Sequence, residues 1–192
     1  KTAKEVEKAE IAEMAKVFDR PTRWTLGALR TQPATPDRLI ARVMAKDWVD
    51  KGTPAWKYLT PQIWGGERNL KSHETTLAAA GFLPTGMRAV PGRDMPLDQH
   101  GNMTRGTINQ ILSQLRLQVM DGYESRMSYD PKSKARALKK AGGRIFAATP
   151  GKGLPLGIWQ RTSGRGLKCL LLFVKSPAYR PRFGFFDVAQ RV

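Results

Sequence analysis

Between residues 104 and 120, apolar side chains recur at the spacing that places them along one face of an α-helix. The stripe consists of Ile108, Ile111, Leu112, Leu115 and Val119, which follow the i, i+3, i+4, i+7 pattern. Thr104 precedes the stripe, and its hydroxyl suits it to cap the first helical turn. Because such a stripe must be buried, the pattern predicts a globular core against which this helix packs.

Two further helices are expected, over residues 3–19 and 67–80. In the first, apolar residues near one stripe predict the buried side, and polar residues such as Glu10 cover the rest. The Asp19-Arg20-Pro21 sequence ends it, because the residue before a proline is disfavoured in helical geometry. In the other, Gly81 suits the left-handed residue after the last turn, and His73 is expected on a mostly solvated face.

Strand patterns occupy much of the remaining chain. They are predicted over residues 23–32, 38–46, 145–148, 157–160 and 168–174. Residues 54–64 are rich in aromatics, 82–103 are rich in turn residues, and 183–189 fit either a strand or a helix. The order of segments predicts an α+β fold, an antiparallel β-sheet packed with a few α-helices and carrying extended loops or arms.

A length of 192 residues fits one large domain or two small ones. We expect a single domain over residues 1–192. The N-terminal helix belongs to this domain. Residues 121–142 carry many lysines and a short Ala/Leu pattern, which fits either an extended basic arm or one solvated helix.

Positive charge is concentrated near the C-terminus. The chain has a net charge of +17, and residues 131–192 hold fourteen Lys and Arg against Asp187 alone. This charge predicts contact with nucleic acid or an acidic protein surface, although a solvated surface that aids solubility explains it too. The candidate contacts are Lys132, Lys134, Arg136, Lys139, Lys140, Arg180 and Arg182.

Residue patterns for catalysis, metal binding and cofactor binding are not found in the sequence. The two histidines, His73 and His100, belong to no metal-ligand motif, and Cys169 begins an apolar run that favours an inert buried thiol. The loop around His100 fits a turn before a helix cap better than an acid–base pair. The glycine-rich segment 151–153 lacks the remaining elements of a phosphate-binding loop. We therefore expect no enzyme activity, no metal and no cofactor.

Membrane insertion is not expected, because the longest apolar run, from Cys169 to Val174, is much shorter than the roughly 18 residues of a spanning helix. No signal peptide is visible, and a lone cysteine excludes an internal disulfide. The sequence starts without methionine, so residues upstream are expected to be missing.

Several stretches, taken in order, carry a resemblance to a known family. They are 17–22 (VFDRPT) with 33–37 (PATPD), 58–63 (YLTPQI) with Gly65-Gly66, 98–103 (DQHGNM) before 108–113, and 156–161 (LGIWQR) before 179–182 (YRPR). Over about residues 15–190 this order resembles tailed-bacteriophage and prophage minor tail proteins of the Z type, also called tail completion or neck proteins. The resemblance rests on the order of the stretches, since no single motif is specific.

The resemblance implies a structural virion protein that acts at the head–tail junction, in tail assembly and head–tail joining, with no catalytic residues. It implies a homo-oligomeric ring, six-fold or a multiple, in contact with other neck, tail or connector proteins and with packaged DNA. Ring interfaces would account for the surplus aromatics Trp24, Trp48, Trp56, Trp64 and Trp159. The location implied is the virion, assembled in the host cytoplasm. The alternative is a non-specific nucleic-acid-binding protein that uses the basic C-terminal surface.

Overall fold

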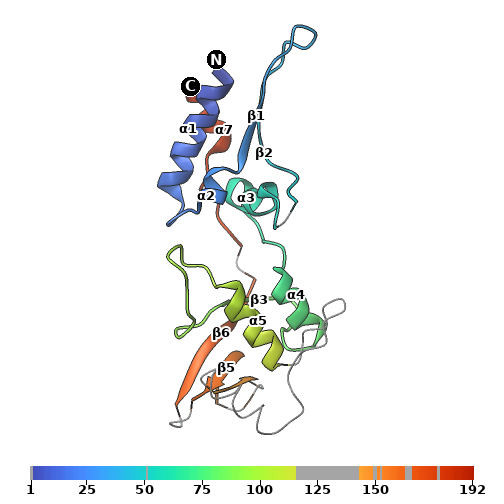
Figure 1. Ribbon diagram of the computed structural model, residues 1–192, viewed down its shortest axis with the longest axis vertical. Coiled ribbons are helices and arrows are strands. Elements are labelled where there is room, and N and C mark those ends of the chain that lie inside the picture. Colours follow the sequence, from blue (N-terminus) through green and yellow to red (C-terminus); the bar gives the residue numbers. More distant parts are fainter. Residues whose placement is uncertain are drawn as a thin grey trace. The chain divides into compact units, whose positions relative to one another are not determined.

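The computed structural model describes most of the chain, in seven stretches: 2–50, 52–115, 143–148, 151, 153–162, 166–176 and 178–192. The described residues form six helices and two antiparallel sheets, which confirms the α+β class (Figure 1). The expected basic arm, 121–142, lies outside them.

Two compact units make up the chain, where the sequence had suggested one domain. The terminal unit combines Lys1–Asn69 with Pro177–Val192, and the inserted unit is Leu70–Ser176. Each has its own cluster of buried hydrophobic side chains. Periodicity indicates which residues are buried, but not which segments share a core.

The terminal unit contains four helices and a two-stranded antiparallel sheet. Its elements are α1 (Thr2–Val17), α2 (Arg23–Leu26), β1 (Leu29–Gln32), β2 (Arg42–Ala45), α3 (Ala55–Trp64) and α7 (Phe185–Arg191). Residues 23–26 are helical where a strand was expected, because the Thr22 hydroxyl accepts the Thr25 N–H at 3.1 Å and caps a short turn. The segment 183–189, left open between strand and helix, is mostly helical.

The core of the terminal unit lies among α1, α3, β1 and the C-terminal segment. Its buried members are Met14, Ala28, Leu29, Ala55, Leu59 and Phe183. Phe183 packs against Phe18, with ring centroids 5.8 Å apart. The last residues of the chain are thus part of the same core as the first helix.

A backbone bridge joins the two segments that lead into and out of the inserted unit. Gly66 and Tyr179 exchange N–H···O hydrogen bonds of 3.0 and 2.8 Å. The neighbouring Gly65 has a φ of +77°, and a Cβ at that position would lie 2.8 Å from the Tyr179 carbonyl oxygen. Gly65 therefore allows the two segments to run side by side, and Gly66 has a φ of +89°, which also favours glycine.

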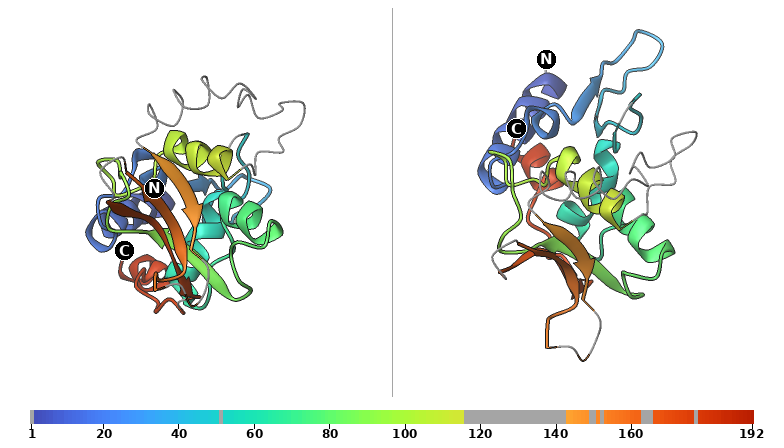
Figure 2. Two further views of the ribbon diagram at one scale, coloured as in Figure 1. Left: turned by 90° about the horizontal axis from the view of Figure 1, so that it is seen from below. Right: turned by 60° about the horizontal axis from the view of Figure 1, so that its bottom comes forward.

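The described residues of the inserted unit form a four-stranded antiparallel sheet and two helices. Its elements are α4 (Ser72–Ala79), β3 (Met87–Pro91), α5 (Arg105–Gln114), β4 (Arg144–Ala147), β5 (Gly157–Arg161) and β6 (Leu167–Lys175). The strand order is β3-β6-β5-β4, so the first and last strands in sequence are neighbours (Figure 2). Strand β3 lies in the segment that was expected to be turns.

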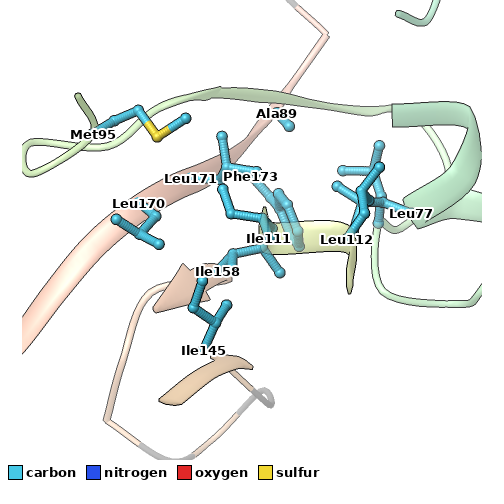
Figure 3. Packing of buried hydrophobic residues seen from close by; sticks show 11 residues of the cluster. Leu77, Ala89, Met95, Ile111, Leu112, Ile145, Ile158, Leu170, Leu171 and Phe173 are labelled. Carbon is cyan, nitrogen blue, oxygen red and sulfur yellow. The ribbon is translucent and has the colours of Figure 1, made fainter. Parts of the chain in front are cut away.

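The core of the inserted unit packs α4 and α5 against one face of this sheet. Ile111 and Leu112 of α5 meet Leu77 of α4 and the sheet residues Ile158 and Leu171 (Figure 3). The predicted stripe is therefore confirmed over the described part of the helix, while Val119 lies outside it. Thr104 caps α5 as expected, accepting the Thr107 N–H at 3.2 Å.

Candidate interaction surfaces

The β1–β2 hairpin carries exposed apolar residues at its end. Beyond the four paired residues of each strand, Thr35 and Arg38 form a second, isolated bridge that closes a tight turn over Pro36 and Asp37. Leu39 and Ile40 follow this turn outside the β1–β2 ladder, and 85% and 53% of their surfaces are exposed. Apolar side chains so exposed at the end of a ribbon are a candidate contact with another molecule.

Four tryptophans of the terminal unit also face solvent. Trp24, Trp48, Trp56 and Trp64 are 55%, 72%, 42% and 67% exposed. Trp64 stacks obliquely on Phe186, itself about half exposed, with ring centroids 5.1 Å apart. Trp159, in the inserted unit, is half-buried, and its indole N–H donates to the Pro155 carbonyl at 3.0 Å. The terminal unit is thus where the exposed indole surface lies.

A pocket of about 250 Å³ opens at the base of the hairpin, wholly within the terminal unit. Its lining residues are Arg23, Trp24, Gly27, Ala28, Lys46, Val49, Ala55 and Tyr58. Burial raises the pKa of the Tyr58 phenol, so this hydroxyl stays protonated. Apolar walls with two cations fit a ligand that is apolar and carries a negative charge.

The outer face of the inserted sheet combines arginine with aromatic rings. Arg144 lies opposite Arg161 across β4 and β5, and Phe146 lies opposite Trp159, while the intervening Ile145 is buried in the core. The Arg161 guanidinium lies 5.9 Å from the centroid of the Phe146 ring. Both arginines are exposed. This pattern suits contact with a polyanion, because cations bind phosphates and aromatic rings stack on bases.

The predicted nucleic-acid contacts are only partly within the described residues. Arg180 and Arg182 are both exposed, but Arg182 is held against its own unit. Its Nε donates to Gln62 Oε1 at 2.6 Å, and its guanidinium lies 5.8 Å from the Phe18 ring. Lys132, Lys134, Arg136, Lys139 and Lys140 lie outside the described residues.

The surroundings of His73, His100 and Cys169 fit structural roles. His73 is buried against the core, contrary to the expectation of a solvated face, because α4 turns this side toward the sheet. Asp98 accepts the backbone N–H groups of His100 and Asn102 at 2.8 and 2.9 Å, which is the side-chain pattern of a turn. Cys169 is half-buried, and burial raises the pKa of its thiol. Among the described residues, no cluster of His, Cys, Asp and Glu could hold a metal ion.

Two fully buried glutamates were not predicted. Glu74 Oε2 accepts the Lys71 N–H at 2.6 Å and its Oε1 accepts the Ala89 N–H at 2.7 Å, so this carboxylate joins α4 to β3. Glu10 was expected in solvent, but it lies buried one turn before Met14, and neither of its oxygens has a hydrogen-bond partner. The spacing from Met14 was the available signal for Glu10.

Comparison with protein-family models, with curated proteins and with solved structures finds no match to this chain. No helix in the described part is long and apolar enough to cross a membrane. The surfaces above are therefore the basis for a functional proposal.

Proposed function

We propose that this chain is a structural virion protein of a tailed bacteriophage, acting at the head–tail junction in tail completion and head–tail joining. The observation that supports an assembly role best is the exposed apolar surface of the terminal unit, on the hairpin end and the four tryptophans. The order of sequence motifs, which resembles that of minor tail proteins of the Z type, supports the head–tail junction as the assembly.

Summed over the terminal unit, the exposed apolar area is comparable with one partner's share of a subunit contact. A tryptophan buries about 150–250 Å² when fully covered, so the four partly exposed tryptophans offer roughly 500 Å² together. A stable interface takes about 800 Å² from each partner. The hairpin end supplies much of the remainder, because Leu39 is almost fully exposed.

A homo-oligomeric ring, six-fold or a multiple, is the assembly we propose, in contact with other neck, tail or connector proteins. A ring at this junction surrounds the path of packaged DNA. The net charge of +17 is compatible with such a position, because the phosphates of DNA can neutralise this charge whatever the base sequence.

Light scattering in high salt tests the proposal. At about 0.5 M NaCl the screening length falls to roughly 4 Å, so purely electrostatic association is suppressed while apolar contacts persist. We expect a species with a mass of at least twice 21.4 kDa, in whole multiples. A protein that stays monomeric at every concentration contradicts the proposal.

Non-specific nucleic-acid binding is the second candidate, and the arginine–aromatic face of β4 and β5 favours it. Replacing both Arg144 and Arg161 by Ser should weaken binding of a short duplex, measured by fluorescence anisotropy at low salt. Arg93→Ser, at an exposed position of the same unit, is the control. Unchanged duplex binding by the double variant would show that Arg144 and Arg161 do not form the DNA contact.

A further inference from the structure

We infer that the hairpin tip of one copy, residues 35–40, inserts into the pocket at the hairpin base of a neighbouring copy. The inference rests on the proposed assembly role and specifies its contact. It makes the interface heterologous: each copy offers a tip on one side and a pocket on the other.

The tip cannot fill the pocket of its own chain. Ala28 and Lys46 of the lining adjoin Leu29 and Ala45, the first and last paired residues of the hairpin. The tip lies beyond the other end of the four-residue ladder. Because a strand rises about 3.3 Å per residue, the ladder separates the tip from these lining residues by at least roughly 10 Å. In both figures the β1–β2 hairpin extends away from its base (Figures 1 and 2). A hairpin tip that occupies this pocket must therefore come from another copy.

The tip is preorganised for insertion. Pro33 and Pro36 restrict its backbone, and the Thr35–Arg38 bridge is closed by hydrogen bonds of 2.9 and 3.0 Å. Little conformational entropy is then lost on docking. Leu39 and Ile40 supply apolar side chains, and both are exposed. Asp37 is the tip's one carboxylate; the adjoining Arg38 is also exposed, so the tip has no net charge and the complementarity rests on Asp37 itself.

The pocket is complementary to this combination. Trp24, Val49 and Tyr58 provide apolar walls, and Arg23 and Lys46 provide positive charge. None of the eight described residues that line it carries a carboxylate. Asp47, which follows Lys46, is ion-paired with Arg30 at 3.2 Å. Arg23 and Lys46 thus suit the Asp37 of an incoming tip, while the walls cover its leucine and isoleucine.

Unless two copies exchange tips reciprocally, a tip-in-pocket contact repeats from copy to copy: the copy that inserts its tip still has its own pocket open for the tip of a further copy. Heterologous contacts of this kind close into rings when the rotation permits, and otherwise form filaments. The inferred contact is therefore one that generates the ring of the proposed function.

Charge exchange between tip and pocket tests the inference. Asp37→Lys places like charges together, and so does Lys46→Glu with the wild-type Asp37; each should weaken self-association by at least about tenfold in light scattering. The double variant Asp37→Lys/Lys46→Glu should recover it. An equimolar mixture of the two single variants should also assemble, because each tip then meets an oppositely charged pocket on the other protein.

Two controls separate this contact from the wider proposal. Leu39→Ser should weaken assembly, whereas Leu97→Ser, at an exposed leucine of the inserted unit, should not. If wild type assembles and neither the charge variants nor Leu39→Ser weaken it, or if the exchange gives no recovery, the tip-in-pocket contact is wrong and the assembly role stands. A wild type that remains monomeric overturns the assembly role and the inference with it.

Discussion

Glu10 and Glu74 are both fully buried, yet their surroundings have opposite consequences. Glu74 accepts two backbone hydrogen bonds, which compensate for the lost hydration of its carboxylate. Glu10 has no hydrogen-bond partner for either oxygen. Burial, with a smaller contribution from the Glu13 carboxylate, raises the Glu10 pKa from 4.5 to about 7, against the opposing effect of Arg191. One glutamate stabilises the fold, and the other destabilises it once ionised.

Replacement of Glu10 by Gln should stabilise the protein in a pH-dependent way. Between pH 4.5 and 7 the folded state binds more protons than the unfolded state, so the free energy of unfolding of wild type falls as pH rises. The gain from Glu10→Gln should be small at pH 4 and reach up to about 3 kcal/mol above pH 8. Thermal melts across pH measure it, with Glu5→Gln, at an exposed position of α1, as the control. A gain independent of pH would contradict the assigned pKa.

Replacement of Glu74 by Ala should destabilise the inserted unit. The change leaves the Lys71 and Ala89 N–H groups without their acceptor. An unsatisfied buried donor such as that of Ala89 costs about 1–3 kcal/mol, and the part-buried Lys71 N–H adds to this. We expect a loss of roughly 3 kcal/mol in urea unfolding. Glu5→Ala again provides the control, since that side chain is exposed. Equal stability of the two variants would show that the carboxylate does not hold α4 to β3.

At the scale of elements, the sequence was informative where a side-chain pattern covers the whole element. Strands β5 and β6 and the start of helix α5 were predicted within a few residues, because most of their apolar residues pack on one core. The predicted helix runs on to residue 120, and residues 116–120 lie outside the described part of the chain. Strand β3 was missed because its pairing with β6 is a long-range contact, and the prolines and glycines around it favour turns. Helix α2 was missed because its four residues are too few for a period.

The candidate surfaces were predicted to a smaller extent. The surplus of tryptophans pointed to interfaces, and four of the five are substantially exposed. The pocket was not predictable, since it joins residues from 23 to 58 that only the fold brings together. Composition likewise suggested Arg182 as a phosphate contact, but could not show its hydrogen bond to Gln62, which is 120 residues away.

The buried stripe of α5 gives a prediction for that element. Ile111→Asp introduces a carboxylate at a position that is 1% exposed, which should cost about 3 kcal/mol or more. Arg105→Asp, in the first exposed turn of the same helix, should be neutral or slightly stabilising because it faces the helix N-terminus. Urea titration compares them. If Ile111→Asp and Arg105→Asp have similar free energies of unfolding, Ile111 is not part of the core of the inserted unit.

At the scale of the whole molecule, charge and exposed apolar surface are divided between the units. The inserted unit holds seventeen Lys and Arg against six Asp and Glu, a net +11, and the terminal unit holds sixteen against ten, a net +6. The four exposed tryptophans, the hairpin tip and the pocket all belong to the terminal unit. This division suggests that assembly and polyanion binding are separable properties.

Separating the units tests that division. The Gly66–Tyr179 bridge holds the ends of the insertion together, so a short glycine-rich linker replacing residues 70–176 should leave the terminal unit folded. Because it keeps tip and pocket, this shortened protein should still self-associate in high salt. The excised segment 70–176, with its own core, should fold and bind duplex DNA in a salt-dependent manner. Circular dichroism, light scattering and fluorescence anisotropy measure folding, assembly and binding. If the shortened protein is folded but monomeric while the full chain assembles, the assembly surface includes the inserted unit, and the exposed tryptophans alone do not explain it.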